Sequence, residues 1–190
     1  MAWNDRQELR VASSGQVYIA DIGVVLPEDL NPLDPADFIG LGLISEDGVT
    51  MSYTPTIEEF RSWQNRGVTR REVTAIDLTA AFALQQWNES TVPFAFGGGQ
   101  ISQPSPGIFR YDWPQGNEAL NDKVMVIDAV DGDIMDRYVI PLGNVTESVE
   151  TTLQRAALSM LPITFAAIET DEQAIAYWLT NDEAAFAAGS

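Results

Sequence analysis

The chain has 190 residues and a formal net charge of −18, because 28 acidic side chains stand against only 10 lysines and arginines. It contains no cysteine and no histidine, which excludes disulfides, thiolate or imidazole metal sites, and catalysis by the commonest general base. Since basic side chains supply most of the affinity for nucleic acids, direct binding of DNA or RNA through a basic patch is disfavoured.

The length predicts one domain with its own core, which at this size buries about 70% of the surface of the unfolded chain. Residues 1–14 are polar with few apolar anchors, so we predict an N-terminal arm at 1–14 and a single domain at 15–190. Trp3 lies in the arm, where its burial requires a partner, and it is a candidate arm anchor at a subunit contact. No apolar stretch has the length of a signal peptide or a membrane span, so we expect a soluble protein made in the cytoplasm.

The first part of the domain is predicted to form strands joined by turns. We expect a strand over Gly15–Val25, with Val17 and Ile19 on the same face. The proline-containing stretch "LPEDLNPLDPADF" follows and is predicted to be an extended, non-helical connector. Between Leu41 and Pro55, the sequence "SEDG" supplies an Asp–Gly pair typical of two-residue hairpin turns, which predicts a β-hairpin there.

The middle of the chain gives one ambiguous segment and one clear strand. The segment "TIEEFRSWQ" fits helix and strand spacing, but the preceding Pro55 and the following "NRG" favour a strand. From Ile76 to Leu84 every second residue is apolar, which is the pattern of a half-buried strand. "NESTVPFAF" is predicted to form a short helix capped by Asn88 and ended by the glycine run, and "QISQPSPG" to be a loop.

The last part of the chain is also predicted to be mostly strands. "IFRYDW" is a short strand, and "KVMVIDAV" with "DIMDRYVIPLG" forms a hairpin around an Asp–Gly turn. "VTESVETTLQRAALSMLPITFAAIE" fits both a helix and strands, and Pro162 favours strands, while "AIAYWL" is another strand. Short strands with turns about every 8–12 residues predict a mainly β fold, an antiparallel β-sandwich or barrel with one short helix.

The motifs that could support chemistry are weak. "FGGGQ" lacks the lysine of a phosphate loop and is predicted to be a flexible connector. Four aspartates near a turn lack the register of a calcium loop: Asp128, Asp131, Asp133 and Asp136. The neighbours Glu58 and Glu59 are expected to point to opposite faces of a strand, so they would not converge on a substrate. We therefore predict no catalytic, cofactor-binding or metal-binding residue, and a carboxylate-only hydrolase stays open as an alternative.

The cations are unevenly distributed, since four of the ten lie within eleven residues of each other: Arg61, Arg66, Arg70 and Arg71. In so acidic a chain this cluster is a candidate subunit-contact loop that seeks carboxylates on a neighbouring copy. The alternative is a solvated hairpin that balances its own Glu58, Glu59 and Glu72. The acidic excess likewise has two interpretations, a solubilising surface or a surface that repels polyanions.

Four sequence pieces occur in order in the first half: "GQVYIA", a connector with "LP" and "LDP", "LGLISEDGVT", and an acidic segment that ends in "SWQ". "FALQQWNES" and "FAFGG" continue this pattern to about residue 99. Together the pieces resemble phage major tail proteins, the tail tube subunits of long non-contractile tails in actinobacterial phages. The second half of the chain is less distinctive.

The resemblance implies a β-sandwich or barrel with a flanking helix, in which six subunits close into a ring and rings stack into a tube. Genomic DNA would pass through the lumen without specific binding, and an acidic wall would repel its phosphates. The partners implied are other copies of the chain and tail proteins such as the tape measure and the terminator, with no membrane. The protein would be part of the virion tail, made in the host cytoplasm. Some relatives carry an extra C-terminal immunoglobulin-like domain, which we do not expect here.

Two further alternatives to a tube subunit stay open. Within assembly proteins, the chain could be a tail terminator or a head–tail connector, which caps a single ring. In a different class, it could be a β-sandwich binding module.

Overall fold

The computed structural model describes residues 9–115, 121–147, 149–170 and 173–186. In these residues the chain is mainly antiparallel β, as predicted. The strands are β1 Ser14–Ala20, β2 Ile39–Gly40, β3 Thr50–Arg61, β4 Val68–Leu84, β5 Gln100–Ser105, β6 Ile108–Asp112, β7 Lys123–Asp131, β8 Ile134–Val145, β9 Leu161–Ala167 and β10 Tyr177–Thr180. The short helices are α1 Thr91–Ala95 and α2 Glu183–Phe186.

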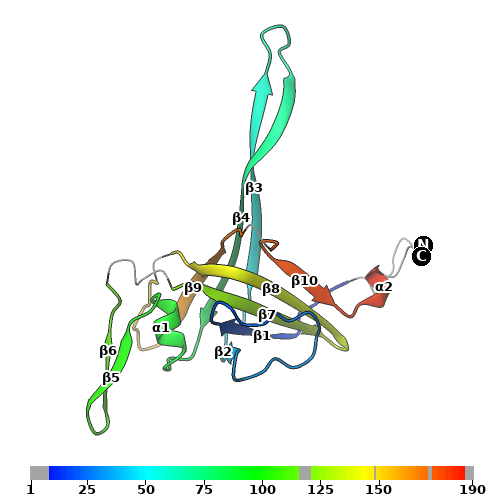
Figure 1. Ribbon diagram of the computed structural model, residues 1–190. Helices are drawn as coiled ribbons and strands as arrows, with labels where there is room; N and C mark the ends of the chain where they lie inside the picture. Colours follow the sequence, from blue (N-terminus) through cyan, green and yellow to red (C-terminus); the bar gives the residue numbers. More distant parts are fainter. Residues whose placement is uncertain (1–8, 116–120, 148, 171–172, 187–190) are drawn as a thin grey trace.

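One curved sheet forms the body of the molecule (Figure 1). Its strands follow the order β2-β1-β7-β8-β9-β4-β3, and β10 pairs with the first half of β8. The described strand pairs of this sheet are all antiparallel. The hairpin of β5 and β6 forms a separate two-stranded sheet, and Figure 1 shows it projecting from the side of the body that carries α1.

Residues 39–45 join the two ends of the curved sheet. They pair with β1 at their start and with the end of β4 at their finish. Three backbone hydrogen bonds make these contacts: Leu41 N–H to the Val17 oxygen (2.9 Å), Ser45 N–H to the Ala83 oxygen (2.8 Å) and Gln85 N–H to the Leu43 oxygen (2.9 Å). This segment therefore closes the sheet into a barrel-like body at one end.

The main core lies inside the curved sheet, and the alternation of β4 explains its composition. Leu78, Ala80, Phe82 and Leu84 are buried, while the residues between them are only half-buried. Ala80, Phe82 and Leu84 belong to the main core cluster. Leu41 and buried residues of β1, β7, β8, β9 and α1 complete it: Val17, Ile19, Met125, Ile127, Ile140, Leu161, Ile163, Phe165, Phe94 and Ala95. Burying an aliphatic or aromatic side chain of this kind contributes about 1.5–3 kcal/mol, so the body has a core of its own.

A second, smaller core lies on the opposite face of the sheet, under the connector that runs from β1 to β2. Ala20, Val124, Val126 and Val139 are buried there together with Phe38 of the connector. The connector is non-helical, as its prolines predicted.

Arg137 of β8 anchors this connector from beneath. Its side chain is 1% exposed and forms a two-pronged pair with Asp128, directly opposite on β7, at 2.7 and 2.8 Å. Its remaining nitrogen donates to the backbone oxygens of Asp29 and Asn31 in the connector, at 3.0 and 2.9 Å. The hydrogen bonds to Asp128 raise the pKa of the Arg137 guanidinium above its ordinary value. The buried charge is therefore fully paired and ties the connector to the sheet.

Three local predictions are confirmed. The hairpin of β7 and β8 turns through Gly132 and Asp133, and Gly132 has the positive φ (62°) that the first position of such a turn requires. The helix α1 follows Asn88, whose side-chain oxygen accepts from the N–H groups of Ser90 and Thr91 at 2.9 Å. The segment "TIEEFRSWQ" is a strand up to Arg61.

The predicted hairpin over Leu41–Pro55 is wrong. The segments before and after its turn both run along β4: Ile44 bridges to Leu84, and Thr50 pairs with Ala81. Gly48 has a positive φ (69°), but the segments on its two sides both run antiparallel to β4, so the chain does not reverse there as it does in a hairpin turn. The turn is therefore a short loop that interrupts one strand-like stretch, and β4 is long enough to pair with the residues before and after this loop.

Three other element predictions need correction. The first strand ends at Ala20 rather than Val25. The predicted loop "QISQPSPG" contains β5, because this segment pairs with β6, and its proline is tolerated in a strand with one free edge. Residues 149–160 lack strand pairing among the described residues, while 161–167 form β9. The division into an arm at 1–14 and a domain at 15–190 stays a prediction.

Replacing Arg137 by alanine is expected to lower the free energy of unfolding by about 3–5 kcal/mol, because Asp128 would be left buried and unpaired. Urea denaturation of the dilute protein measures this loss. The control is Arg110→Ala, which removes the Arg110–Asp112 pair, whose side chains are 67% and 49% exposed. We expect that change to cost less than about 1 kcal/mol. Equal losses in the two variants would contradict the anchoring role of Arg137.

Candidate assembly surface

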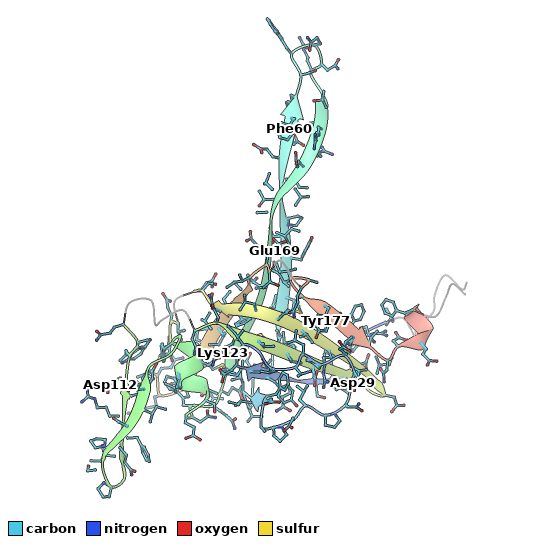
Figure 2. All side chains as sticks on the ribbon, viewed as in Figure 1. Asp29, Phe60, Asp112, Lys123, Glu169 and Tyr177 are labelled. Atoms are coloured by element: carbon cyan, nitrogen blue, oxygen red, sulfur yellow. The ribbon has the colours of Figure 1, made fainter. Side chains whose placement is uncertain are left out.

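The strands β3 and β4 extend far beyond the barrel-like body as a long hairpin (Figure 1). Residues 52–61 of β3 and 69–77 of β4 are all exposed, whereas β4 becomes buried from Leu78 onward. Figure 2 shows Phe60 near the outer end of the hairpin, far from Lys123 and Asp29 in the body. The hairpin is held by β3–β4 backbone pairing, and its outer part contributes nothing to the core.

The two faces of the hairpin differ in chemistry. On one face, Tyr53 pairs with Leu78, Pro55 with Ile76, and Ile57 with Val73. A register shift between Thr56 and Ile57 leaves Thr74 without a direct partner, and this bulge keeps the apolar residues on one face. The opposite face carries mainly threonines and carboxylates, with Phe60 near the tip: Thr54, Thr56, Glu58, Glu72 and Asp77. The hairpin is thus amphipathic although both faces meet solvent in the single chain.

The apolar face continues the interior face of the body. At the hairpin base, Met51 packs against the main core and Leu78 is buried. The face of the sheet on which they lie continues along the hairpin into solvent. Its outer side chains are 60% exposed at Tyr53, 51% at Ile57, 52% at Val73 and 42% at Ile76. Contiguous exposed apolar surface of this kind marks an interaction site. The outer edge of β3 also lacks a strand partner among the described residues, which leaves backbone groups free to pair.

The predicted arginine cluster lies at the far end of this hairpin. Arg71 pairs with Glu59 across the hairpin at 3.0 Å, Arg61 approaches the same carboxylate at 3.4 Å, and Arg70 pairs with Glu72 at 3.3 Å. These arginine side chains are 64–70% exposed, so the local pairs contribute little stability. Residues 58–72 hold four arginines and three glutamates, so the tip is slightly positive on a chain of net charge −18.

The arginine cluster was found from the sequence, but the exposed apolar face of the hairpin was not. An alternating pattern of apolar residues is the same for a strand that is buried in a domain and for one that projects into solvent. Glu58 and Glu59 do point to opposite faces, since Glu58 pairs with Glu72 and Glu59 with Arg71. Trp3, the candidate arm anchor, lies outside the described residues.

The β5–β6 hairpin is a second projecting element. Ile101, Ile108 and Phe109 are 41%, 59% and 71% exposed. The hairpin is attached to the body by aromatic packing at its base, where the Phe96 and Trp113 rings lie 4.2 Å apart. The Tyr111 hydroxyl donates to the Gly98 oxygen at 2.6 Å, and burial raises the pKa of this phenol.

Three of the four aspartates near the β7–β8 turn make structural contacts through their side chains. Asp128 pairs with Arg137, Asp136 accepts from the Trp178 indole N–H at 3.1 Å, and Asp131 accepts from the Val11 N–H at 2.9 Å. In the part of the chain that the structure describes, no three His, Cys, Asp or Glu side chains are placed to hold a metal ion. The glycine run ends α1, with positive φ at all three glycines (74°, 135° and 92°).

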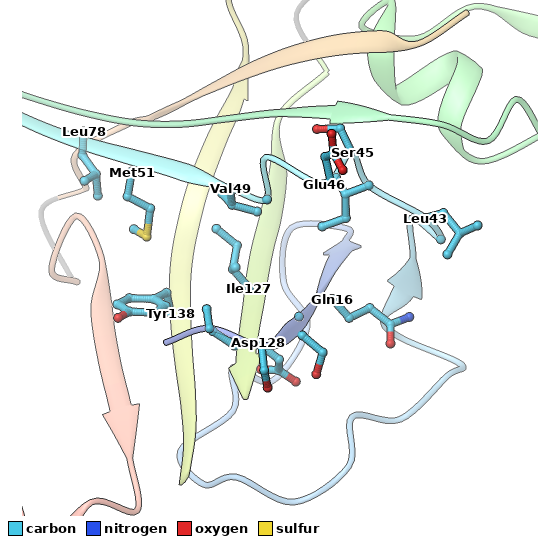
Figure 3. A pocket seen from close by; sticks show the side chains of 18 of the residues that line it. Gln16, Leu43, Ser45, Glu46, Val49, Met51, Leu78, Ile127, Asp128 and Tyr138 are labelled. Carbon is cyan, nitrogen blue, oxygen red and sulfur yellow. The ribbon is translucent and has the colours of Figure 1, made fainter. Parts of the chain in front are cut away.

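A pocket of about 720 Å³ lies between the hairpin base and β1 (Figure 3). Leu78, Met51 and Val49 reach toward it from one side, and Ile127 and Gln16 from the other. The lining also includes Leu43, Ile44, Glu46 and Tyr138. Its floor is therefore the apolar core, and one wall is the start of the hairpin's apolar face.

The comparisons with known proteins point to one family. A family model described as phage tail tube protein matches residues 1–189. No curated protein matches the chain. Within the residues that the structure describes, no helix combines the length and the apolar character needed to cross a bilayer.

Replacing Thr54–Asp77 by Asn-Gly is expected to leave the body folded, because Tyr53 and Leu78 are directly paired and a two-residue turn can join them. A shorter loop also costs less closure entropy, so we expect a melting temperature within about 4 °C of the parent or slightly higher. Circular dichroism melts of the dilute proteins measure this. Loss of a cooperative transition in the shortened protein would show that the hairpin supports the body.

Proposed function

Because the chain belongs to the phage tail tube protein family, it is a structural component of the virion tail, and we propose that six copies close into a ring and that rings stack into a tube. Genomic DNA passes through the lumen of this tube without specific binding. The observation that carries the proposal is the amphipathic β3–β4 hairpin, whose apolar face and free edge extend beyond the body. Burial against neighbouring copies would cover both.

Ring closure accounts for the surface that the single chain leaves uncovered. Strand edges exposed to solvent invite uncontrolled pairing, and a ring whose sheets join removes them. Obligate interfaces of this kind bury about 2,000 Å² or more and are rich in apolar residues. Exposed side chains of both projecting hairpins supply apolar surface for such interfaces: Tyr53, Ile57, Val73, Ile76, Ile101, Ile108 and Phe109.

The charge of the chain supports an acidic lining for the conduit. With 28 acidic side chains and 10 basic ones, a lumen wall built from this chain would repel DNA phosphates and prevent sticking. At physiological ionic strength the field reaches only about 8 Å, so the wall acts on DNA that is close to it. The wall would therefore keep the passing DNA from adhering to it rather than bind the DNA.

The hairpin tip, with Arg61, Arg66, Arg70 and Arg71, is the proposed subunit-contact loop. A slightly positive tip on a strongly acidic subunit favours contact with carboxylates of another copy, and arginine can pair with them in two-pronged geometry. Other tail proteins, such as the tape measure and the terminator, would meet the tube inside and at its end. We propose no catalytic role and no cofactor, since the family is structural. The origin from actinobacterial phages stays a prediction.

Electron microscopy of the purified protein tests the function directly. We expect long tubes, with sixfold symmetry in the averaged cross-section and more carboxylates than cations on the inner wall. Single rings that never lengthen would indicate a terminator or connector instead. A monomer at all concentrations would contradict the proposal.

Charge reversal at the tip is expected to impair assembly. The double variant Arg70→Glu/Arg71→Glu should give a much smaller pelletable fraction in sedimentation assays and few tubes in micrographs. The matched control is Thr152→Glu/Gln154→Glu/Arg155→Glu, which lowers the net charge by the same four units at exposed sites outside both projecting hairpins. Intact tube assembly by the tip variant would count against this contact loop.

A further inference from the structure

We propose that Trp63 at the tip of the β3–β4 hairpin of one copy inserts into the pocket at the hairpin base of a second copy. The proposal rests on the proposed function, self-assembly of the chain, and names the acceptor for the hairpin tip. It is built from three observations: a fully exposed tryptophan, an apolar pocket, and opposite charges around the two.

Trp63 has no cover in the single chain. It lies in the loop between Arg61 and Val68 and is 100% exposed. Tryptophan buries about 150–250 Å² when it is covered, and it is enriched among the residues that dominate binding at interfaces. A fully exposed tryptophan at the end of a rigid projecting hairpin is therefore placed to anchor a contact.

The pocket offers a matching apolar site. Leu78 and Ile127 are buried in its wall, Val49 and Met51 are half-buried, and Leu43 at its edge is 61% exposed. Figure 3 shows Leu78, Met51 and Val49 facing Ile127 across the pocket, and Leu43 at its periphery. Its volume of about 720 Å³ lies within the range of about 300–1,000 Å³ that is usual for binding pockets.

The charges around the two surfaces are complementary. Trp63 is flanked in sequence by Arg61 and Arg66. Glu46 lines the pocket, and Asp47 follows it in the same exposed turn. Among the described residues that line the pocket there is no lysine or arginine. A tryptophan that has two arginines near it in the same loop would thus enter an apolar pocket with an acidic edge.

The occupant must be another copy, because the tip cannot reach its own pocket. Tyr53 lines the pocket, the paired strand from there to Arg61 extends about 26 Å at roughly 3.3 Å per residue, and Trp63 lies two residues beyond its end. The donor and the acceptor therefore lie at opposite ends of one stiff element. A contact that joins two different surfaces of identical subunits repeats from copy to copy, giving closed rings or open stacks.

Engineered disulfides test the contact, because the chain has no native cysteine. The test variant is Gln64→Cys/Leu43→Cys, which keeps Trp63 and places one thiol at the tip and one at the pocket edge. The control is Gln64→Cys/Leu153→Cys, since Leu153 is 78% exposed and does not line the pocket. After mild oxidation we expect a ladder of covalent dimers and higher oligomers on denaturing gels for the test variant only.

Two matched substitutions test the binding energy. Leu43→Arg places a cation at the pocket edge and should weaken self-association about tenfold or more, whereas Leu153→Arg should not. Trp63→Ala should give a loss of the same order, measured by sedimentation against protein concentration.

The outcomes separate this inference from the proposed function. Normal tubes without a specific disulfide ladder, together with equal behaviour of Leu43→Arg and Leu153→Arg, would overturn the docking of Trp63 and leave the tube function standing. A wild-type protein that never associates would overturn both.

Discussion

Continuous backbone pairing between β3 and β4 is the interaction on which the rest of the structure depends. The register runs from Thr50 and Ala81 at the body to Arg61 and Val68 at the tip, with only two irregularities. In the body, β4 also pairs with β9 and supplies core residues, so the base of the hairpin is fixed. Outside the body the same backbone pairing holds the projecting part of the β3–β4 hairpin, which has no core beneath it. This hairpin is stiff because both strands are long and paired, and it places an apolar face and four arginines away from the body.

This arrangement separates the two tasks of a structural subunit. The body folds around its own core, and its connector is pinned by the buried Arg137–Asp128 pair. The projecting hairpins contribute little to that core and present the apolar surface that another copy can cover. A two-stranded hairpin has no core of its own, so burial against another copy would add to the stability that its backbone pairing gives. Folding and assembly can therefore be altered independently by substitution.

The net charge of the subunit restricts the contacts that the proposed assembly can use. Identical subunits with a net charge of −18 repel one another at long range, so contacts must be short-range and apolar or locally compensated. The slightly positive tip and the acidic turn at Glu46 and Asp47 meet this requirement when they come from different copies. Carboxylates left outside the contacts would then be available to face DNA in the lumen.

The sequence alone determined the local features of this protein. Alternation from Ile76 to Leu84 predicted a half-buried strand, Gly132 and Asn88 marked a hairpin turn and a helix start, and composition excluded thiol and imidazole chemistry. Each of these signals depends on the backbone preferences or side-chain spacing of a few neighbouring residues, so it can be recognised without knowledge of the rest of the fold.

Only the tertiary structure decided which strands pair and which apolar faces are covered. The same alternation places Leu78 in the core and Ile76 in solvent, because a two-residue period defines two faces but not what packs on them. The turn at Gly48 was misread for the same reason: the partner of both its flanks is β4, which lies far along the chain.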